Sequence, residues 1–316
     1  MAGDWWLDRY LFGEFLQVAQ ARPIHLIGSS IGSWRMACLA QRDPVAALAR
    51  GHRAYIHEQQ YSAKPRPSEV TTVLRRALDL ILGAHGVDEI LSHPWARLHI
   101  ITAAASGWLA NQGRLPLTAG LAMTVVTNLM GRHRLGAHLN RVIFDAAGDE
   151  SPFRGLNDLP TRHVPLTATN LRDALLASGS IPLLMEGVRI AGDPGYLHWD
   201  GGILDYHPDF DFGDGDGLVL YPHFYRHIIP GWFDKSLPWR RASVRNFRRA
   251  LIIAPSASFV ASLPGGKIPD RRDFYAFPPE ERIRRWQQVL DQSARLGDEL
   301  RELVLTGRIA DHVTDW

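Results

Sequence analysis

The sequence predicts an α/β fold, with a mostly parallel central sheet covered by helices on both faces. Short apolar runs typical of buried strands alternate along the chain with longer segments of helical periodicity, a pattern characteristic of parallel sheets. Hydrophobic residues make up 46% of the chain and charged residues 22%, as in ordinary globular proteins. Because the 316 residues contain neither a repeat nor a linker-like stretch, we expect a single domain over residues 1–316.

The expected elements begin with an amphipathic helix over residues 5–19, where apolar side chains recur at helical spacing. The positions in this repeat are Leu7, Leu11, Phe15 and Val18. A strand over residues 24–27 and a helix over residues 33–40 follow. Further helices are expected over residues 68–82, 117–139, 167–176 and 280–305, and further strands over residues 97–104, 188–190, 196–199, 217–221 and 250–253.

The composition argues against several classes of protein. A net charge of only +2 gives no reason to expect a nucleic-acid partner. Cys38 is the single cysteine, which excludes an intrachain disulfide framework and a cysteine-rich metal site, and we expect its side chain to be buried. No signal peptide is visible, and the longest apolar segment, residues 117–130, is too short to span a bilayer. We therefore expect a cytoplasmic protein.

The turn between the strand over residues 24–27 and the helix over residues 33–40 carries the strongest signal. Its sequence, Gly28-Ser29-Ser30-Ile31-Gly32, fits the G-x-S-x-G pattern that presents a nucleophilic serine between a strand and a helix. We expect Gly28 and Gly32 to be required because side chains there would clash in so tight a turn. The pattern is short enough to arise by chance, so a plain Gly/Ser turn is the alternative.

A second polar position follows a later strand. Asp200 ends the expected strand over residues 196–199 and precedes Gly201 and Gly202, which leave open backbone around the carboxylate. A serine hydroxyl needs a neighbouring base to act as a nucleophile at neutral pH, and Asp200 can supply one if the two strand ends meet. Taken alone, D-G-G is also a common turn sequence.

These segments together resemble the patatin-like phospholipase family. Their order and spacing along the chain carry the resemblance, which reaches from residue 24 to residue 208. The segments are Gly28–Gly32, then Ala177–Pro182 (A-S-x-x-I-P), then Asp200–Gly202 followed by Asp205 and Pro208.

The resemblance implies a three-layer α/β/α fold and a serine hydrolase that cleaves acyl esters of lipids. Ser30 would be the nucleophile and Asp200 the base of a Ser–Asp dyad, with an acyl-enzyme intermediate and neither a metal nor an organic cofactor. The backbone N–H of Ile31, at the start of a helix, would stabilise the oxyanion. A Ser–His–Asp α/β-hydrolase is the alternative enzyme, with His207, His223 or His312 as the histidine.

The chain departs from the family pattern at its start. The family has a strand and a glycine-rich loop, G-G-G-x-x-G, before the first helix, and the loop supplies further oxyanion donors. Here only Met1–Asp4 stands in that place, and Gly3 is interpreted as a remnant of the loop. We expect an oxyanion hole that is built differently, or else a catalytically weakened relative that binds a lipid or a protein.

Two other clusters are interpreted as structural. The acidic run after residue 208 does not fit a calcium loop because glycines fall at ligand positions, and the histidine pair beyond it lies at a strand end rather than on a metal-binding helix. The residues concerned are Asp209, Asp211, Asp214, Asp216, His223 and His227. We expect no metal at either cluster.

Peripheral contact with a membrane stays open. Arg241, Arg245 and Arg248 would share one face of a helix and meet lipid headgroups, or form a plain solvated face. Trp5 and Trp6 would likewise contact lipid or pack into the core.

Overall fold

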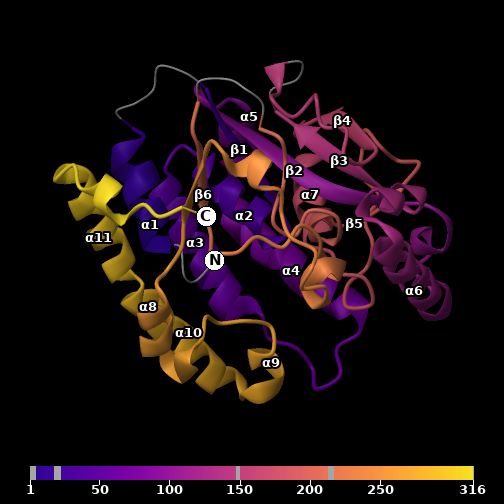
Figure 1. Cartoon of the computed structure of the whole chain (residues 1–316). Coiled ribbons are helices and arrows are strands. Elements are labelled where there is room, and N and C mark those ends of the chain that lie inside the picture. Colours follow the sequence, from indigo (N-terminus) through magenta and orange to yellow (C-terminus); the bar gives the residue numbers. More distant parts are fainter. Residues whose placement is uncertain (1–4, 18–22, 147–149, 213–216, 316) are drawn as a thin grey trace.

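The centre of the molecule is a five-stranded sheet (Figure 1). The computed structural model describes residues 5–17, 23–146, 150–212 and 217–315. Four strands lie in the order β1-β2-β3-β4, and β5 pairs with β2. The strands are β1 (Ile24–Ser29), β2 (Ala96–Ala105), β3 (Leu139–Asp145), β4 (Thr161–Pro165) and β5 (Leu197–Asp200).

Strands β1 and β5 share one edge of β2. The opposite edge is taken by β3, which pairs with β2 from His99 to Ala105. Strand β1 runs parallel to the first part of β2 and ends with Ser29 opposite Ile101, while β5 runs antiparallel to the last part and ends with Asp200 opposite Thr102. The carboxyl ends of β1 and β5 therefore meet at adjacent positions of β2.

The strand pairings are mixed, and three of the five in the described part of the chain are parallel. Among the described strands, β1–β2, β3–β4 and β6–β7 are parallel, whereas β2–β3 and β2–β5 are antiparallel. Strands β6 (Val219–Pro222) and β7 (Ala250–Ile253) form a separate two-stranded sheet. The expected fold class is confirmed.

Both faces of the sheet are covered. Along β2, Leu98, Ile100 and Ala104 belong to the main core cluster. This cluster also contains buried side chains of the helices α2 (Ile31–Leu39), α3 (Pro44–Arg53), α4 (Pro67–Leu82) and α7 (Leu171–Ser178). Ala103 and Ala105 point to the other face, against a cluster that includes a residue from α6 (Arg114–Met130). This alternation follows from the two-residue period of a strand and produces the layered architecture.

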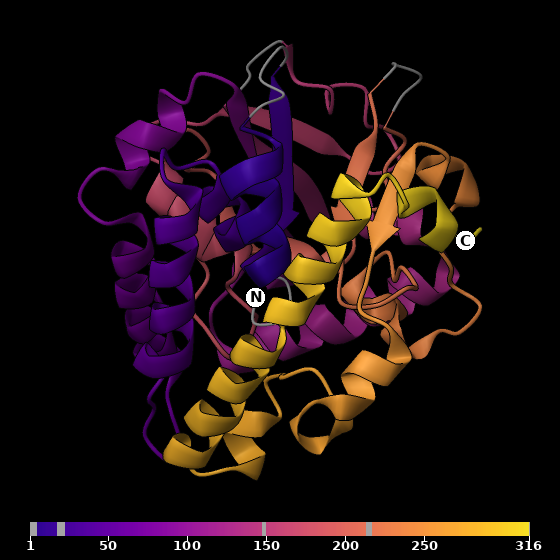
Figure 2. The same ribbon diagram turned by 90° about the vertical axis from the view of Figure 1, so that its left-hand side faces the viewer.

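The helices surround this sheet, and Figure 1 shows α6 and α11 at opposite sides of the molecule. In Figure 2, α11 crosses α1 near the N-terminus, and the two helices are in contact. None of the described helices is long and apolar enough to cross a membrane. The helices are α1 (Trp5–Tyr10), α2 (Ile31–Leu39), α3 (Pro44–Arg53), α4 (Pro67–Leu82), α5 (Gly86–Leu91), α6 (Arg114–Met130), α7 (Leu171–Ser178), α8 (Ala257–Ser262), α9 (Asp273–Ala276), α10 (Pro279–Gln292) and α11 (Ala294–Leu305).

The first helix differs from the expectation over residues 5–19. After α1 the chain forms a π-helical segment, Leu11–Phe15, in which the Leu16 N–H reaches back five residues to the Leu11 carbonyl. The wider turn changes which side chains face the core beyond Leu11, so Phe12 is buried and Phe15 is 44% exposed.

The expected helix over residues 117–139 was wrong at its C-terminal end. Helix α6 stops at Gly131, whose φ of 148° lies outside the helical region, and a short 3₁₀ segment over Arg132–Ala137 follows. Leu139 then begins β3, a strand that the sequence analysis did not predict.

Two further expectations also needed correction. The helix over residues 280–305 is two helices, because at Ser293 both the backbone N–H and the side-chain hydroxyl bond to the Leu290 carbonyl and tighten the turn. Residues 188–190 contribute only an isolated bridge between Val188 and His198. Cys38 is buried as expected, and this burial raises the pKa of its thiol to about 12.

Candidate active site

Ser30 lies in a strained turn between β1 and α2. Its φ is 53°, a conformation that non-glycine residues rarely adopt. Its backbone N–H donates to the Ser178 hydroxyl at 3.0 Å, and that hydroxyl donates to the Ile101 carbonyl at 2.6 Å. The turn is therefore anchored to both α7 and β2, and the strain is held by these contacts.

The hydroxyl of Ser30 meets the carboxylate of Asp200. Ser30 Oγ donates to Asp200 Oδ2 at 2.9 Å, and the Gly202 N–H donates to Asp200 Oδ1 at 2.7 Å. The backbone N–H of Asp200 donates to the Ser180 carbonyl at 2.9 Å. The two residues come together because β1 and β5 end at neighbouring positions on one edge of β2.

Burial changes the acidity of this carboxylate. Asp200 is only 6% exposed, and burial raises its pKa to about 6 against the lowering effects of the Gly202 N–H, the Ser30 hydroxyl, Lys235 and Arg271. A carboxylate with a raised pKa is a stronger base than an exposed one and is still ionised at neutral pH.

Of the two glycines in the turn, only Gly28 is sterically required. A Cβ at Gly28 would lie 2.6 Å from both the Gly32 carbonyl carbon and the Ser33 nitrogen, which are backbone atoms that cannot move aside. At Gly32 an added Cβ would meet nothing within 4 Å. The steric expectation for Gly32 was wrong because its Cα–H points into open space.

The glycines after Asp200 are both constrained. A Cβ at Gly201 would overlap the Ile101 carbonyl, and one at Gly202 would lie 3.0 Å from Asp200 Oδ1 and 3.9 Å from Ser30 Cβ. The D-G-G sequence thus lets the backbone pass close to β2 and leaves the carboxylate room beside Ser30.

Backbone donors are available beside Ser30. The N–H groups of Ile31 and Gly32, in the first turn of α2, have no acceptor among the described residues. Orphan N–H groups at a helix start attract negative charge. The expected oxyanion donor, Ile31, therefore has its N–H unoccupied.

A comparison with known protein families covers the same part of the chain. A family model of patatin-like phospholipases matches residues 10–208, which include Ser30 and Asp200. The chain belongs to the patatin-like phospholipase family. Membership indicates a lipid acyl hydrolase in general terms. None of the curated proteins compared with the chain matches it.

A buried ion cluster holds together the chain segments next to Ser30 and Asp200. The Ser29 hydroxyl donates to the Asp205 carbonyl at 2.6 Å, and the Asp205 carboxylate accepts from Arg141 at 2.7 Å and from Arg132 at 3.0 Å. Arg141 also bonds Asp158. Asp205, which the resemblance included without a role, fixes the segment after Asp200 against the strand before Ser30.

Sequence reasoning missed two cations near the dyad. Lys235 and Arg271 both act on the Asp200 carboxylate, and Lys235 Nζ lies 3.6 Å from the centre of the Tyr206 ring. Neither cation belongs to a motif, and both follow the part of the chain that the family model matches. The one available signal was rarity, since the chain contains only three lysines.

The histidines of the alternative triad lie elsewhere. Among the described residues, no histidine bonds to Ser30 or Asp200. His207 accepts from the Ile229 N–H and packs its ring 4.1 Å from that of His223, while His312 lies in an exposed segment near the C-terminus.

The structure gives no support for a metal site in the part of the chain it describes, where no three His, Cys, Asp or Glu residues are grouped to hold an ion. The Asp209 carboxylate accepts from the Ser243 N–H and the Asn246 amide, so it fastens one loop to another. Burial raises the pKa of this carboxyl.

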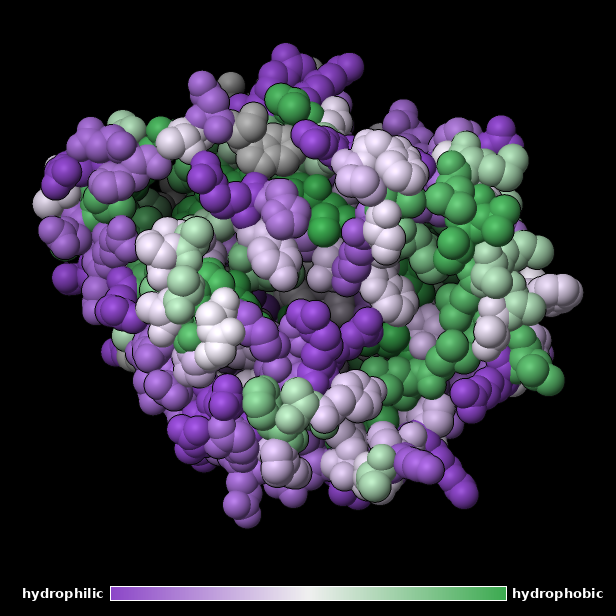
Figure 3. Space-filling view, turned by 60° about the horizontal axis from the view of Figure 1, so that its bottom comes forward, coloured by the Kyte–Doolittle hydropathy of each residue, from purple (hydrophilic) through white to green (hydrophobic). Residues whose placement is uncertain are grey.

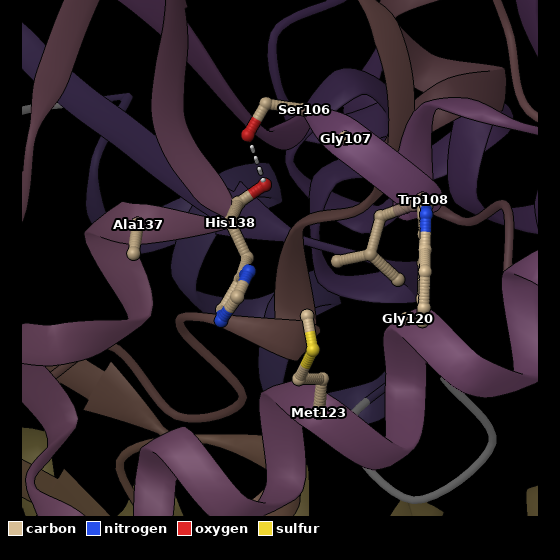
Figure 4. Close-up of a pocket in the computed structure, with 8 residues that line it drawn as sticks. Ser106, Gly107, Trp108, Gly120, Met123, Ala137 and His138 are labelled. Atoms are coloured by element: carbon tan, nitrogen blue, oxygen red, sulfur yellow. Dashed lines mark hydrogen bonds between the residues drawn. The ribbon is translucent and has the colours of Figure 1, made fainter.

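A cavity of about 250 Å³ lies beside α6, away from the dyad (Figure 4). Across it the Ser106 hydroxyl donates to the His138 carbonyl at 3.0 Å. Ser30 and Asp200 do not line it. The lining residues are Ser106, Gly107, Trp108, Leu109, Gly120, Met123, Ala137 and His138.

The arginine run does not form the expected helical face. Residues 240–249 contain only a short 3₁₀ segment, Val244–Phe247, so Arg241, Arg245 and Arg248 do not align along one helix.

Several residues singled out by the sequence lie outside the described part of the chain. They are Gly3, Val18, Asp214, Asp216 and the side chains of Trp5 and Trp6.

Proposed function

We propose that this chain is a serine hydrolase that cleaves carboxylic acyl esters of lipids through a Ser30–Asp200 dyad. The observation that carries the proposal is the 2.9 Å hydrogen bond from Ser30 Oγ to Asp200 Oδ2. The strained turn at Ser30, the raised pKa of Asp200 and the membership of the family are consistent with this role.

In the proposed reaction, Ser30 Oγ attacks the ester carbonyl carbon while its proton passes to Asp200 Oδ2. The negative charge on the carbonyl oxygen is stabilised by the Ile31 and Gly32 N–H groups. Asp200 then gives the proton to the leaving alcohol, which leaves an acyl group on Ser30. In the second half, Asp200 takes a proton from water, the resulting hydroxide attacks the acyl carbonyl, and the proton returns to Ser30 as the acid departs.

A fluorophosphonate probe tests the nucleophile directly. We expect the wild-type protein to be labelled and to hydrolyse a short 4-nitrophenyl ester, and both signals to vanish in Ser30→Ala. Ser92→Ala, which alters an exposed helix-end serine bonded to Asp88, is the matched control and should keep both signals. A folded wild-type protein that is neither labelled nor active would contradict the proposal and favour a binding protein.

The base is tested by Asp200→Asn. The amide retains the shape and the hydrogen bond from Gly202 but cannot accept a proton. We expect the rate of acylation to fall by about 10²- to 10⁴-fold without loss of folding. Activity that survives Asp200→Asn but disappears in His207→Gln or His223→Gln would favour the triad.

We also propose that the outer face of α6 touches an anionic lipid surface. Its exposed apolar side chains are joined by Trp108 from the neighbouring 3₁₀ segment, and an apolar area lies on this side of the molecule in Figure 3. The helix contains no acidic residue and begins at Arg114, and Arg134 is exposed just beyond its end. The apolar members are Leu115, Met123, Val125, Val126, Leu129 and Met130, between 41% and 85% exposed.

Charge and position favour a bilayer as the occupant of this face. Basic residues at both ends complement anionic headgroups, and the apolar stripe suits the acyl boundary. On its inner side α6 holds the segment that carries Lys235, because the Asn128 amide donates to Asp234 at 2.8 Å. Lipid bound at α6 would thus lie near the elements that flank the dyad.

A further inference from the structure

Two cations beside the dyad are held by aromatic rings and not by acids. Lys235 lies in a 3₁₀ segment, Trp232–Ser236, with its Nζ 3.6 Å from the centre of the Tyr206 ring and 5.8 Å from that of Trp232. The guanidinium of Arg271 lies 5.4 Å from the same Trp232 ring. The four side chains therefore form one cluster, which we call the cation cluster.

The cation cluster adjoins the reacting atoms. A Cβ placed on Gly202 would lie 3.7 Å from Tyr206 Cδ2 on one side and 3.9 Å from Ser30 Cβ on the other. The Tyr206 ring, which lies under Lys235, and Ser30 are thus both within 4 Å of the same point beside Gly202. Both cations also act on the Asp200 carboxylate.

Within the described residues, no carboxylate forms an ion pair with Lys235 or Arg271. The acids next to them in sequence are already used. Asp234 accepts from Asn128 and from its own turn, and Asp270 pairs with Lys267 and Arg272. Asp200 is committed to Ser30 and Gly202.

The cluster is consequently short of negative charge. Partial burial of the ammonium, and then the like charge of Arg271, lower the pKa of Lys235 to about 8 against the raising effect of Asp200. Both residues are solvent-accessible. An oxyanion placed between them would relieve this repulsion, with the guanidinium offering paired donors and the ammonium a point charge.

We propose that Lys235 and Arg271, over the rings of Tyr206 and Trp232, bind a phosphate group carried by the ester substrate. The inference rests on the proposed hydrolase function and narrows it to esters that bear a phosphate close to the scissile bond. Because both cations follow residues 10–208, this preference is a property of the chain's own C-terminal part.

The test compares two esters that differ only in the phosphate, 1-butyrylglycerol 3-phosphate and 1-butyrylglycerol. At pH 7 Asp200 is ionised and Lys235 protonated. We expect wild-type kcat/KM to be at least about tenfold higher for the phosphate ester, since charge-assisted contacts of this kind are strong. In the double variant Lys235→Gln, Arg271→Gln the ratio of the two kcat/KM values should fall about tenfold or more. Arg272→Gln, which removes an adjacent exposed arginine paired with Asp270, should leave the ratio unchanged.

Binding of glycerol 3-phosphate, measured by calorimetry, separates this inference from the hydrolase proposal. Binding that the double variant abolishes, in a protein that cleaves neither ester, would support the subsite and overturn the hydrolase. Equal wild-type kcat/KM for both esters, or a ratio that the double variant leaves intact, would overturn the subsite. If inorganic phosphate binds to the Ser30→Ala protein as tightly as 1-butyrylglycerol 3-phosphate does, the assignment of the site to a phosphate group of the substrate is overturned. Thermal unfolding of each variant checks that these exposed substitutions leave the fold intact.

Discussion

Ser178 Oγ accepts a hydrogen bond from the backbone N–H of Ser30 at 3.0 Å and donates one to the Ile101 carbonyl at 2.6 Å. The end of α7 thereby holds the turn that contains the proposed nucleophile. Two residues later, the Ser180 carbonyl accepts from the N–H of Asp200. The A-S-x-x-I-P segment thus positions both members of the proposed dyad, although neither of its serines touches the reacting atoms.

Replacement of Ser178 by Ala should lower activity more than stability. The change leaves the Ser30 N–H without its acceptor and frees the strained turn, so we expect kcat to fall about tenfold to a hundredfold while the pH dependence is kept. Ser180→Ala is the control, because among the described residues the Ser180 hydroxyl bonds only to the Leu176 carbonyl within its own turn. Ester hydrolysis kinetics measure kcat in both variants. Equal losses of kcat in the two would argue against a positioning role for Ser178.

Gly28→Ala should impair folding, whereas Gly32→Ala should not. The added methyl group at Gly28 would lie 2.6 Å from backbone atoms of Gly32 and Ser33, and overpacking of this kind costs about 1–3 kcal/mol or more. At Gly32 the methyl group meets nothing within 4 Å, and Ala is favoured over Gly in a helix by up to about 1 kcal/mol. Urea unfolding of both variants measures the difference. Equal destabilisation would contradict the structural account.

Part of the candidate site depends only on local sequence, and part depends on contacts between distant segments. The turn around Ser30 and the D-G-G at Asp200 were predictable because both depend on short strand–turn patterns. That the two meet depends on β1 and β5 sharing an edge of β2, which only the resemblance anticipated. Lys235 and Arg271 could not be found from the sequence, because loops folding back from the C-terminal third bring them to Asp200.

Errors in the predicted elements have equally specific causes. The boundary at Gly131 was missed because α6 is apolar on its exposed side, so the usual change in polarity at a helix end is absent. The π-helical segment at Leu11–Phe15 was missed because a repeat of 3.6 residues cannot reveal a local insertion. The break at Ser293 is a tightened turn in an otherwise continuous helical pattern.

The raised pKa of Asp200 predicts opposite pH effects on activity and stability. The base acts as a carboxylate, so kcat/KM should rise with pH up to about 6 and level off above it. Because the folded state holds this proton more tightly than the unfolded chain does, stability from this group is lost as pH rises from about 4 to about 6, by about 3 kcal/mol in total. Asp200→Asn removes that loss. In denaturant unfolding, the free energy of unfolding of Asp200→Asn should rise relative to that of the wild type between pH 4 and pH 7. A difference between the two free energies that does not change with pH would refute the shifted pKa.

Arg141→Met should be among the most destabilising single changes near the site. The guanidinium is fully buried and donates to both oxygens of Asp205 and of Asp158. Removal of one partner from a buried ion pair costs about 3–5 kcal/mol. Arg172→Met is the control, since the pair of Arg172 with Asp79 is exposed and is worth less than about 1 kcal/mol. Chemical denaturation measures both, and a loss at Arg141 no larger than at Arg172 would be the contrary result.

Polar substitutions on the outer face of α6 should weaken binding to lipid vesicles without affecting the folded structure. Val126 and Leu129 are 56% and 53% exposed, so their apolar area is free to enter a bilayer. Insertion of two such side chains contributes on the order of 1–3 kcal/mol, and the double variant Val126→Gln, Leu129→Gln should bind anionic vesicles about ten- to a hundredfold more weakly in a sedimentation assay. Leu80→Gln is the control, because Leu80 is 50% exposed but lies on α4.

Since the outer face of α6 carries Arg114 at one end and Arg134 beyond the other, binding should also weaken with salt and with neutral lipids. Vesicle affinity that is equal in all three proteins would show that α6 faces solvent or a protein partner instead.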